Sequence, residues 1–162
     1  QARALLSLKE RNKKSHAVCQ EVISRIHAGM VIGCYVSVRD ELNTAEILKY
    51  CFEHNIDICT PKVVGRTLCF YKIKSYDDLV PAPFGLLEPM LTVHIPVDKI
   101  DMMIVPLSSY DSENHRTGYG KGYYDSILMD CRNRIGVAFQ EQEVDLIDVE
   151  SHDITLDEII SA

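Results

Sequence analysis

Ten consecutive residues, 116–125, carry the densest set of chemically useful side chains in this sequence. They read Arg-Thr-Gly-Tyr-Gly-Lys-Gly-Tyr-Tyr-Asp. The three alternating glycines let the backbone adopt positive φ angles and approach a ligand closely, so that successive amide groups can turn toward one anion. Arg116 and Lys121 supply positive charge, and Tyr123 can stack on a flat ring and donate its hydroxyl group. This composition is typical of a polyphosphate site.

The common nucleotide-binding motifs do not fit these ten residues. A dinucleotide-binding G-x-G-x-x-G motif starting at Gly118 would need glycine at position 123, where tyrosine stands. A P-loop ending at Lys121 would need glycine at position 115 and serine or threonine at position 122, which are histidine and glycine. The residues therefore indicate a phosphate site of another kind, and the alternative is a flexible glycine-rich turn.

Apolar and aromatic side chains recur at helical spacing after the glycines. The series consists of Tyr123, Ile127 and Cys131, with Tyr124 and Leu128 beside them. We therefore expect the loop to open a helix whose N-terminal end adds positive potential to the site. Asp125 would then lie in the first helical turn.

The rest of the chain alternates between patterns typical of helices and of strands. Helices are predicted over 2–26 and 44–54, with Asn43 or Thr44 capping the second and Asn55 terminating it. Apolar runs that are rich in residues favouring β-structure predict strands over 30–38, 56–60, 67–73, 102–106 and 134–139. This order predicts an α/β fold with a single three-layer domain, in which helices cover both faces of a mostly parallel sheet.

Ligands of such sheets lie beyond the carboxyl ends of the strands. Three chemically interesting segments each follow a predicted strand, namely Glu41, residues 116–125 and the pair His152-Asp153. A proline-rich loop, 80–89, is expected to extend toward the same region. We therefore expect segments far apart in the sequence to converge on one rim of the sheet.

The bulk properties of the chain exclude several classes of protein. With 162 residues, 46% hydrophobic and 25% charged, it suits one globular domain with a substantial core. A net charge of −7 argues against a nucleic-acid surface, and the basic run at Lys9, Arg11, Lys13 and Lys14 is typical of a solvated helix face. The apolar runs are far shorter than a membrane span, and no signal peptide is visible.

The six cysteines form no C-x-x-C pair, and several lie inside apolar runs. This pattern favours buried, reduced thiols, and it points to the cytosol as the compartment.

Residues Gly118–Asp125, with Arg116 before them, resemble the signature of the 5-formyltetrahydrofolate cyclo-ligase family. The other motifs of this chain follow in the same order as in that family. The resemblance covers nearly the whole chain. It also includes residues 35–41 with Thr44, 60–63, 84–89, 104–106 with 110–111, 135–139 with Gln142, and 150–153. Ahead of the element Arg3-Ala-Leu-Leu-Ser7, the family usually has a helix that carries a lysine and an arginine. We therefore expect residues 1–162 to form one domain of this family that lacks the N-terminal helix.

The resemblance implies an ATP- and Mg²⁺-dependent ligase that converts ATP and 5-formyltetrahydrofolate to 5,10-methenyltetrahydrofolate, ADP and phosphate. A formamide carbonyl is a poor electrophile and its oxygen is a poor leaving group, so N10 cannot close the ring directly. Phosphorylation of the formyl oxygen creates a leaving group, which departs after N10 has attacked. Alignment and charge stabilisation provide most of the catalysis of such a transfer.

The resemblance also implies the role of each site residue. ATP is expected to contact Arg116, Thr117, Gly118, Tyr119, Gly120, Lys121, Gly122, Tyr123 and Tyr124. The expected catalytic residues are Arg116, Lys121 and Tyr123. Folate, whose reduced pterin presents N–H and amino donors to a carboxylate, is expected to contact Tyr35, Val36, Glu41 and Tyr123. Mg²⁺, which keeps several waters and needs one or two carboxylates, is assigned to Asp125 and Asp153.

Several of these residues also have a purely structural interpretation. Asp125 would serve as a helix-terminus carboxylate, and Glu41 would be a solvated loop acid. Tyr35 and Val36 would pack in the core, and His152, a candidate proton shuttle, is more often structural in this context.

Two other functional classes are weaker interpretations. A catalytically inactive relative that binds ATP and folate in a regulatory or buffering role would lose a metal carboxylate, yet Asp125 and Asp153 are both present. A sugar-phosphate isomerase or acyl-transferase relative would rest on fold analogy alone. The expected partner is therefore a small molecule, 5-formyltetrahydrofolate with or without a polyglutamate tail. We expect a cytoplasmic monomer without nucleic-acid or membrane partners.

Overall fold

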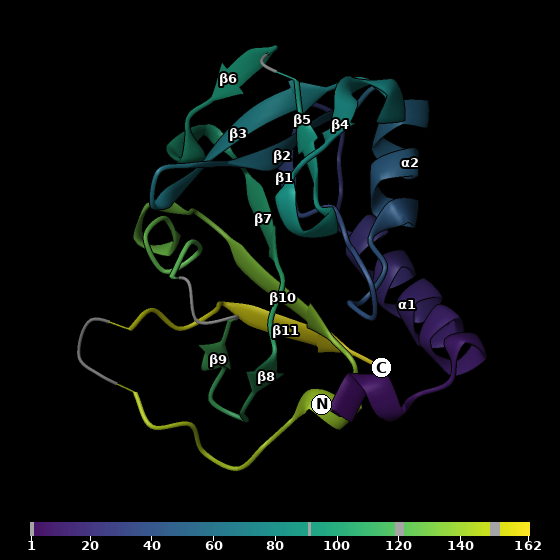
Figure 1. The fold of residues 1–162 in the computed structure, drawn as a ribbon, viewed down its shortest axis with the longest axis vertical. Coiled ribbons are helices and arrows are strands. Elements are labelled where there is room, and N and C mark those ends of the chain that lie inside the picture. Colours follow the sequence, from purple (N-terminus) through teal and green to yellow (C-terminus); the bar gives the residue numbers. More distant parts are fainter. Residues whose placement is uncertain (1, 91, 119–121, 150–152) are drawn as a thin grey trace.

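The computed structural model describes residues 2–90, 92–118, 122–149 and 153–162. Within these ranges the largest element is a seven-stranded sheet with the order β11-β10-β7-β1-β2-β3-β6 (Figure 1). Strands β11 to β2 run parallel, whereas β3 pairs antiparallel with β2 and β6. The strands are β1 (Val31–Cys34), β2 (Asp57–Val64), β3 (Thr67–Ile73), β6 (Val93–Ile95), β7 (Met102–Val105), β10 (Arg134–Ala138) and β11 (Glu158–Ser161). The predicted α/β fold with a mostly parallel sheet is confirmed.

The two central strands consist of apolar residues that are buried on both faces, as in parallel sheets generally. All four residues of β7 are buried, and so are three of the four in β1. The strands pair in parallel, with Ile32 opposite Met102 and Cys34 opposite Ile104. Their carboxyl ends therefore lie side by side, and the loops that follow them leave from the same edge of the sheet.

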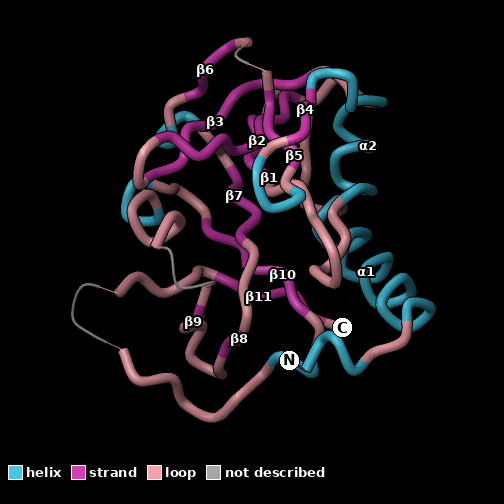
Figure 2. The backbone as a smooth tube through the Cα atoms, viewed as in Figure 1, coloured by secondary structure: helices cyan, strands magenta, loops and turns pink. Residues whose placement is uncertain are grey.

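Both α-helices pack on one face of the sheet, as Figure 2 shows in cyan. The first helix, α1 (Leu8–Ile23), follows a short 3₁₀ helix, η1 (Ala2–Leu5), and the second is α2 (Ala45–Glu53). A capping box begins α1, because Ser7 Oγ accepts the Glu10 amide at 3.1 Å and Glu10 Oε1 accepts the Ser7 amide at 3.2 Å. The buried side chains that join the helices to the sheet are Val18, Cys19, Val22, Ile47, Leu48, Cys51, Ile32, Ile58 and Ile104.

The opposite face is covered by the segment that follows the glycines, and here the sequence prediction is wrong in detail. Instead of a regular α-helix, the described residues form hydrogen-bonded turns and a short 3₁₀ helix, η5 (Leu128–Asp130). Ser126 Oγ donates to the Tyr123 carbonyl at 2.7 Å, and this competing bond favours a turn. Ile127, Leu128 and Cys131 are nevertheless buried against the sheet. Because no α-helix begins at Asp125, the helix dipole does not account for this carboxylate.

Two small antiparallel pairs lie outside the main sheet. Strands β4 (Leu79–Pro81) and β5 (Leu87–Pro89) form a hairpin around the 3₁₀ helix η3 (Pro83–Gly85), within the predicted proline-rich loop. Strand β8 (Ser109–Tyr110) pairs with β9 (Arg116–Thr117), which leads into the glycines. The remaining 3₁₀ helices are η2 (Tyr76–Asp78), η4 (Val97–Lys99) and η6 (Gln140–Gln142).

All six cysteines are free thiols, and five of them are buried, as predicted. In the ranges that the structure describes, none of the helices combines the length and the apolar character needed to cross a membrane.

Candidate functional site

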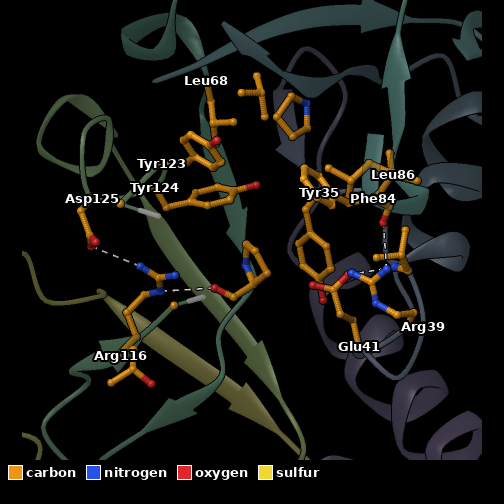
Figure 3. A pocket seen from close by; sticks show the side chains of 18 of the residues that line it. Tyr35, Arg39, Glu41, Leu68, Phe84, Leu86, Arg116, Tyr123, Tyr124 and Asp125 are labelled. Carbon is orange, nitrogen blue, oxygen red and sulfur yellow. Dashed lines mark hydrogen bonds and ion pairs between the residues drawn. The ribbon is translucent and has the colours of Figure 1, made fainter. Parts of the chain in front are cut away.

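A cavity of about 1170 Å³ opens at the carboxyl ends of β1 and β7. One wall comes from the loop after β1, including Tyr35, Val36 and Glu41, and the other from residues 116–118 and 122–125. Asp153 and residues of the η3 hairpin also line the cavity. Figure 3 shows the two walls facing each other, with Arg116, Tyr123, Tyr124 and Asp125 opposite Tyr35, Arg39, Glu41, Phe84 and Leu86. The predicted convergence of distant loops on one rim is confirmed for these residues.

Arg116 is an almost fully buried cation in the cavity wall, and its guanidinium group is bound on several sides. Nε donates to the Pro106 carbonyl at 3.2 Å, and Nη1 lies 3.3 Å from Asp125 Oδ1. The guanidinium carbon lies 5.8 Å from the centre of the Tyr124 ring, within cation–π range. Only 4% of the Arg116 side chain is exposed, against 65% of Asp125. The charge of Arg116 is thus fixed in place at the cavity wall.

The two described glycines of the loop serve different purposes. Gly122 has a φ of +71°, as predicted, and a Cβ there would meet open space. Gly118, in contrast, does not have positive φ. A Cβ at Gly118 would lie 2.6 Å from Arg116 Nη2, so a side chain there would displace the guanidinium group from this position. Tyr119, Gly120 and Lys121 lie outside the described residues, as does His152.

The two tyrosines after the glycines differ in how their hydroxyl groups are placed. The Tyr124 hydroxyl is buried and has no hydrogen-bond partner among the described residues. Burial is the main cause that raises the Tyr124 pKa well above its ordinary value, so this group is a neutral donor. An unpaired buried donor costs free energy unless a ligand or water accepts from it. Tyr123 lines the same wall and is partly buried.

The opposite wall is held by hydrogen bonds within the loop after β1. Tyr35 donates its hydroxyl to the Leu42 carbonyl at 2.8 Å, so this group serves the loop, while the residue lines the cavity. Glu41 Oε1 accepts the Val38 amide at 2.8 Å. Arg39, at a φ of +53°, donates through Nη1 to the carbonyl of Phe84 in the hairpin, at 2.9 Å. The Glu41 carboxylate is therefore held at the wall by its own loop.

Sequence reasoning missed several residues that line the cavity. Arg3 is buried, its Nε lies 3.0 Å from Asp40 Oδ1, and its Nη1 donates to the Leu107 carbonyl at 3.3 Å. Glu88 is also buried and accepts the Val63 amide at 2.8 Å. No local spacing marks these side chains, because contacts distant in sequence bring them to the site.

Several carboxylates line the cavity in the described residues, and two of them are the predicted metal ligands. Asp125 and Asp153 both line it, but Asp125 Oδ1 also pairs with Arg116. Among the described residues there is no group of three or more His, Cys, Asp or Glu side chains that could hold a metal ion. Mg²⁺ commonly binds through one or two carboxylates plus water and substrate phosphates, so this pair of residues fits Mg²⁺ bound together with a nucleotide.

Comparison with known proteins identifies the family of this chain. The family model of the 5-formyltetrahydrofolate cyclo-ligase family matches residues 1–162. A 5-formyltetrahydrofolate cyclo-ligase from Haemophilus influenzae is 26% identical over 98% of this chain and 90% of its own length. The mouse enzyme of the same name is 25% identical over 96% of this chain and 85% of its own.

Solved structures agree as well. The 5,10-methenyltetrahydrofolate synthetase of Aquifex aeolicus has a TM-score of 0.86 and 26% identity, covering 98% of this chain and 83% of that one. The synthetase of Mycoplasma pneumoniae, at 23% identity, has the same fold with a TM-score of 0.78, covering 98% and 90%. This chain therefore belongs to the 5-formyltetrahydrofolate cyclo-ligase family.

Proposed function

We propose that this protein is an ATP-dependent ligase that cyclises 5-formyltetrahydrofolate to 5,10-methenyltetrahydrofolate with release of ADP and phosphate. The family match across the chain supports the reaction. The observation that carries the proposal is the cavity itself, which places the fixed cation Arg116 and the turn at Gly122 opposite the carboxylate of Glu41. One wall thus suits phosphate and the other suits a pterin.

The chemistry divides between the two walls. The formyl oxygen attacks the γ-phosphorus of ATP, the bond to ADP breaks, and the carbon becomes electrophilic. N10 then attacks this carbon and loses its proton, and phosphate leaves with the former formyl oxygen. Arg116, together with Lys121, is proposed to stabilise the charge that builds on the transferring group. The residues proposed to surround the nucleotide are Arg116–Tyr124, the signature stretch. Tyr123 is proposed to contact both ligands.

The pterin side of the reaction is proposed to depend on Tyr35, Val36 and Glu41. The Val38 amide holds the Glu41 carboxylate at the cavity wall, and a carboxylate is the kind of acceptor that matches the N–H and amino donors of a pterin. Asp125 and Asp153 would hold Mg²⁺, which supplies positive charge to phosphate oxygens when it is bound. We further propose that the enzyme works as a cytoplasmic monomer, and the six free thiols support a reducing compartment.

The direct test is to follow methenyltetrahydrofolate by its near-ultraviolet absorbance. Wild-type protein with Mg²⁺ and 5-formyltetrahydrofolate should form it only when ATP is added, with equimolar ADP. Absence of product, together with thermal stabilisation by both ligands, would instead support a binding protein without catalysis.

Replacement of Glu41 by Gln is expected to weaken the binding of 5-formyltetrahydrofolate by about 1–3 kcal/mol, which is the cost of losing a charge-assisted hydrogen bond in a buried site. The structure makes this substitution selective, because Gln can still accept the Val38 amide and hold the turn. Calorimetric titration of Glu41→Gln with each ligand measures the effect, and the affinity for ATP should be unchanged. Equal weakening of both ligands would mean that Glu41 only supports the loop.

Replacement of Asp125 by Asn distinguishes two possible roles of this carboxylate, as a metal ligand or as a partner that orients Arg116. A metal role predicts that the Mg²⁺ concentration needed for half-maximal rate rises several-fold, on the order of the effect of losing one carboxylate ligand. If Asp125 only orients Arg116, the rate should fall equally at every Mg²⁺ concentration. Titration of Mg²⁺ against rate decides between these results. Asp130→Asn, at a carboxylate outside the cavity lining, is the control.

A further inference from the structure

One buried carboxylate beside the cavity has no role in the chemistry described so far. Asp111 follows β8, is 1% exposed, and is not among the residues that line the cavity. Its Oδ1 accepts the amides of Glu113 at 2.9 Å and of His115 at 3.0 Å. Its Oδ2 accepts from His115 Nδ1 at 2.9 Å and from the Ile147 amide at 2.8 Å. Each oxygen of the Asp111 carboxylate thus accepts two hydrogen bonds, and the donors come from two segments of the chain.

The charge of this carboxylate is stabilised by the groups that surround it. Burial alone would raise the Asp111 pKa, but the hydrogen bonds from Ile147, His115 and Glu113 outweigh it and lower the pKa to about 2. Asp111 is therefore ionised at neutral pH. Replacement of Asp111 by Asn would exchange one acceptor oxygen for an amide group that donates. This group would face other donors, so the hydrogen bonds cannot all persist.

The partners of Asp111 belong to two different parts of the cavity wall. His115 lines the cavity and directly precedes Arg116, whereas Ile147 lines it together with Asp148 and Val149. Further bonds join the same two segments. The Val144 amide donates to the Tyr110 carbonyl at 2.8 Å, and a β-bridge pairs Tyr110 with Glu143. The turn at Asp111 is therefore where the two segments are attached to each other.

We propose that Asp111 is a positioning residue for the nucleotide half of the site. It acts through His115 and Ile147, so that Arg116 and the cavity segment 147–149 keep one arrangement around the phosphate groups. The proposal rests on the proposed function, because it takes Arg116 as a nucleotide contact. Misplacement of such groups by about 1 Å can cost on the order of 10²-fold in rate.

The test compares Asp111→Asn with Asp101→Asn, a matched change at the opposite edge of the sheet. Asp101 Oδ2 accepts the Val31 amide at 2.8 Å at the start of β1, and Oδ1 pairs with Arg132 at 3.3 Å. Each variant loses a carboxylate that accepts a backbone amide, but only Asp111 joins two cavity segments. At temperatures where both are folded, Asp111→Asn should raise the KM for ATP by on the order of 10-fold or more. The KM for 5-formyltetrahydrofolate should change little, and Asp101→Asn should change neither KM.

Hydrogen exchange supplies a second measurement that does not depend on turnover. In the protein without ligands, Asp111→Asn should accelerate amide exchange in peptides covering 111–118 and 143–149 together, while α1 and β2 keep wild-type rates. Asp101→Asn should leave both peptides unchanged. If wild-type protein shows no ATP-dependent turnover, the proposed function fails, and the exchange data still decide whether Asp111 couples the two segments.

His115→Phe covers the case in which Asp111→Asn does not fold. It keeps the three backbone donors and a ring of similar size, and it removes only the imidazole donor. It should produce the same pattern of exchange with a smaller rise in the KM for ATP. Wild-type KM for ATP and wild-type exchange in the folded variant would overturn the proposal. A uniform rise in exchange throughout the protein would also overturn it, because it would reduce Asp111 to a general contributor to stability.

Discussion

Replacement of Arg116 by Ala is expected to lower turnover by on the order of 10²-fold or more, because a charge aimed at a transferring phosphoryl group typically contributes that much. The structure explains why this charge is held in one position. The guanidinium group is fixed by the Pro106 carbonyl, by Asp125 and by the face of Tyr124, and it is almost fully buried. Single-turnover rates at saturating ATP would measure the loss, separately from any change in binding.

Two companion variants make this result interpretable. Arg132→Ala removes an arginine of which 56% is exposed and which pairs with Asp101 far from the cavity, so turnover should stay at the wild-type level. Arg116→Lys keeps the charge but loses the planar guanidinium group that binds Pro106 and Asp125 at once, and it should recover only part of the rate. Thermal unfolding of each variant shows how much of any loss comes from instability. Wild-type turnover in folded Arg116→Ala would remove Arg116 from the catalytic residues.

Replacement of Gly122 by Val is expected to abolish ATP binding while the protein remains folded. Gly122 has a φ of +71°, which a β-branched residue adopts only at a considerable cost, and the chain at this point must turn its amides toward phosphate. A Cβ there meets no atom within 4 Å, so the expected effect comes from the backbone angle and from approach of the ligand. Calorimetry with ATP measures binding, and circular dichroism confirms the fold.

Gly65→Val is a closely matched control for this substitution. Gly65 lies in the turn between β2 and β3, has a φ of +61°, and likewise has no atom within 4 Å of a Cβ. Both variants should therefore lose a similar amount of stability, but only Gly122→Val should lose ATP binding. Normal ATP affinity in Gly122→Val would refute the phosphate-binding role of this turn.

Local sequence patterns predicted the elements that depend on local interactions. Asn55, expected to end the second helix, has a φ of +55° directly after α2, and β3 has the predicted bounds Thr67–Ile73. The strand predicted over 30–38 stops at Cys34 instead. Beyond it, the Tyr35 carbonyl accepts from Thr44 Oγ1 at 2.9 Å, and this bond directs the chain into the cavity wall. Hydrophobicity alone does not reveal such a bond.

The site was predictable only where its residues are adjacent in the chain. Residues 116–125 stand out because their chemistry is concentrated in ten positions. Arg3 and Asp111 gave no comparable signal, since each becomes significant through partners far away, at Asp40 and Leu107 for the first and at Ile147 for the second. The strands β6 and β11 were missed for a similar reason, because they are short segments that pair with longer neighbours at or near the edges of the sheet.

The asymmetry of the two faces of the sheet has a thermodynamic consequence. One core is closed by α1 and α2, but the other is closed by Ile127, Leu128 and Cys131, which directly follow the cavity residues Tyr123–Asp125. Any ligand that orders Tyr123–Asp125 therefore also holds the cover of that core in place. Ligand binding and local unfolding of this core are consequently linked.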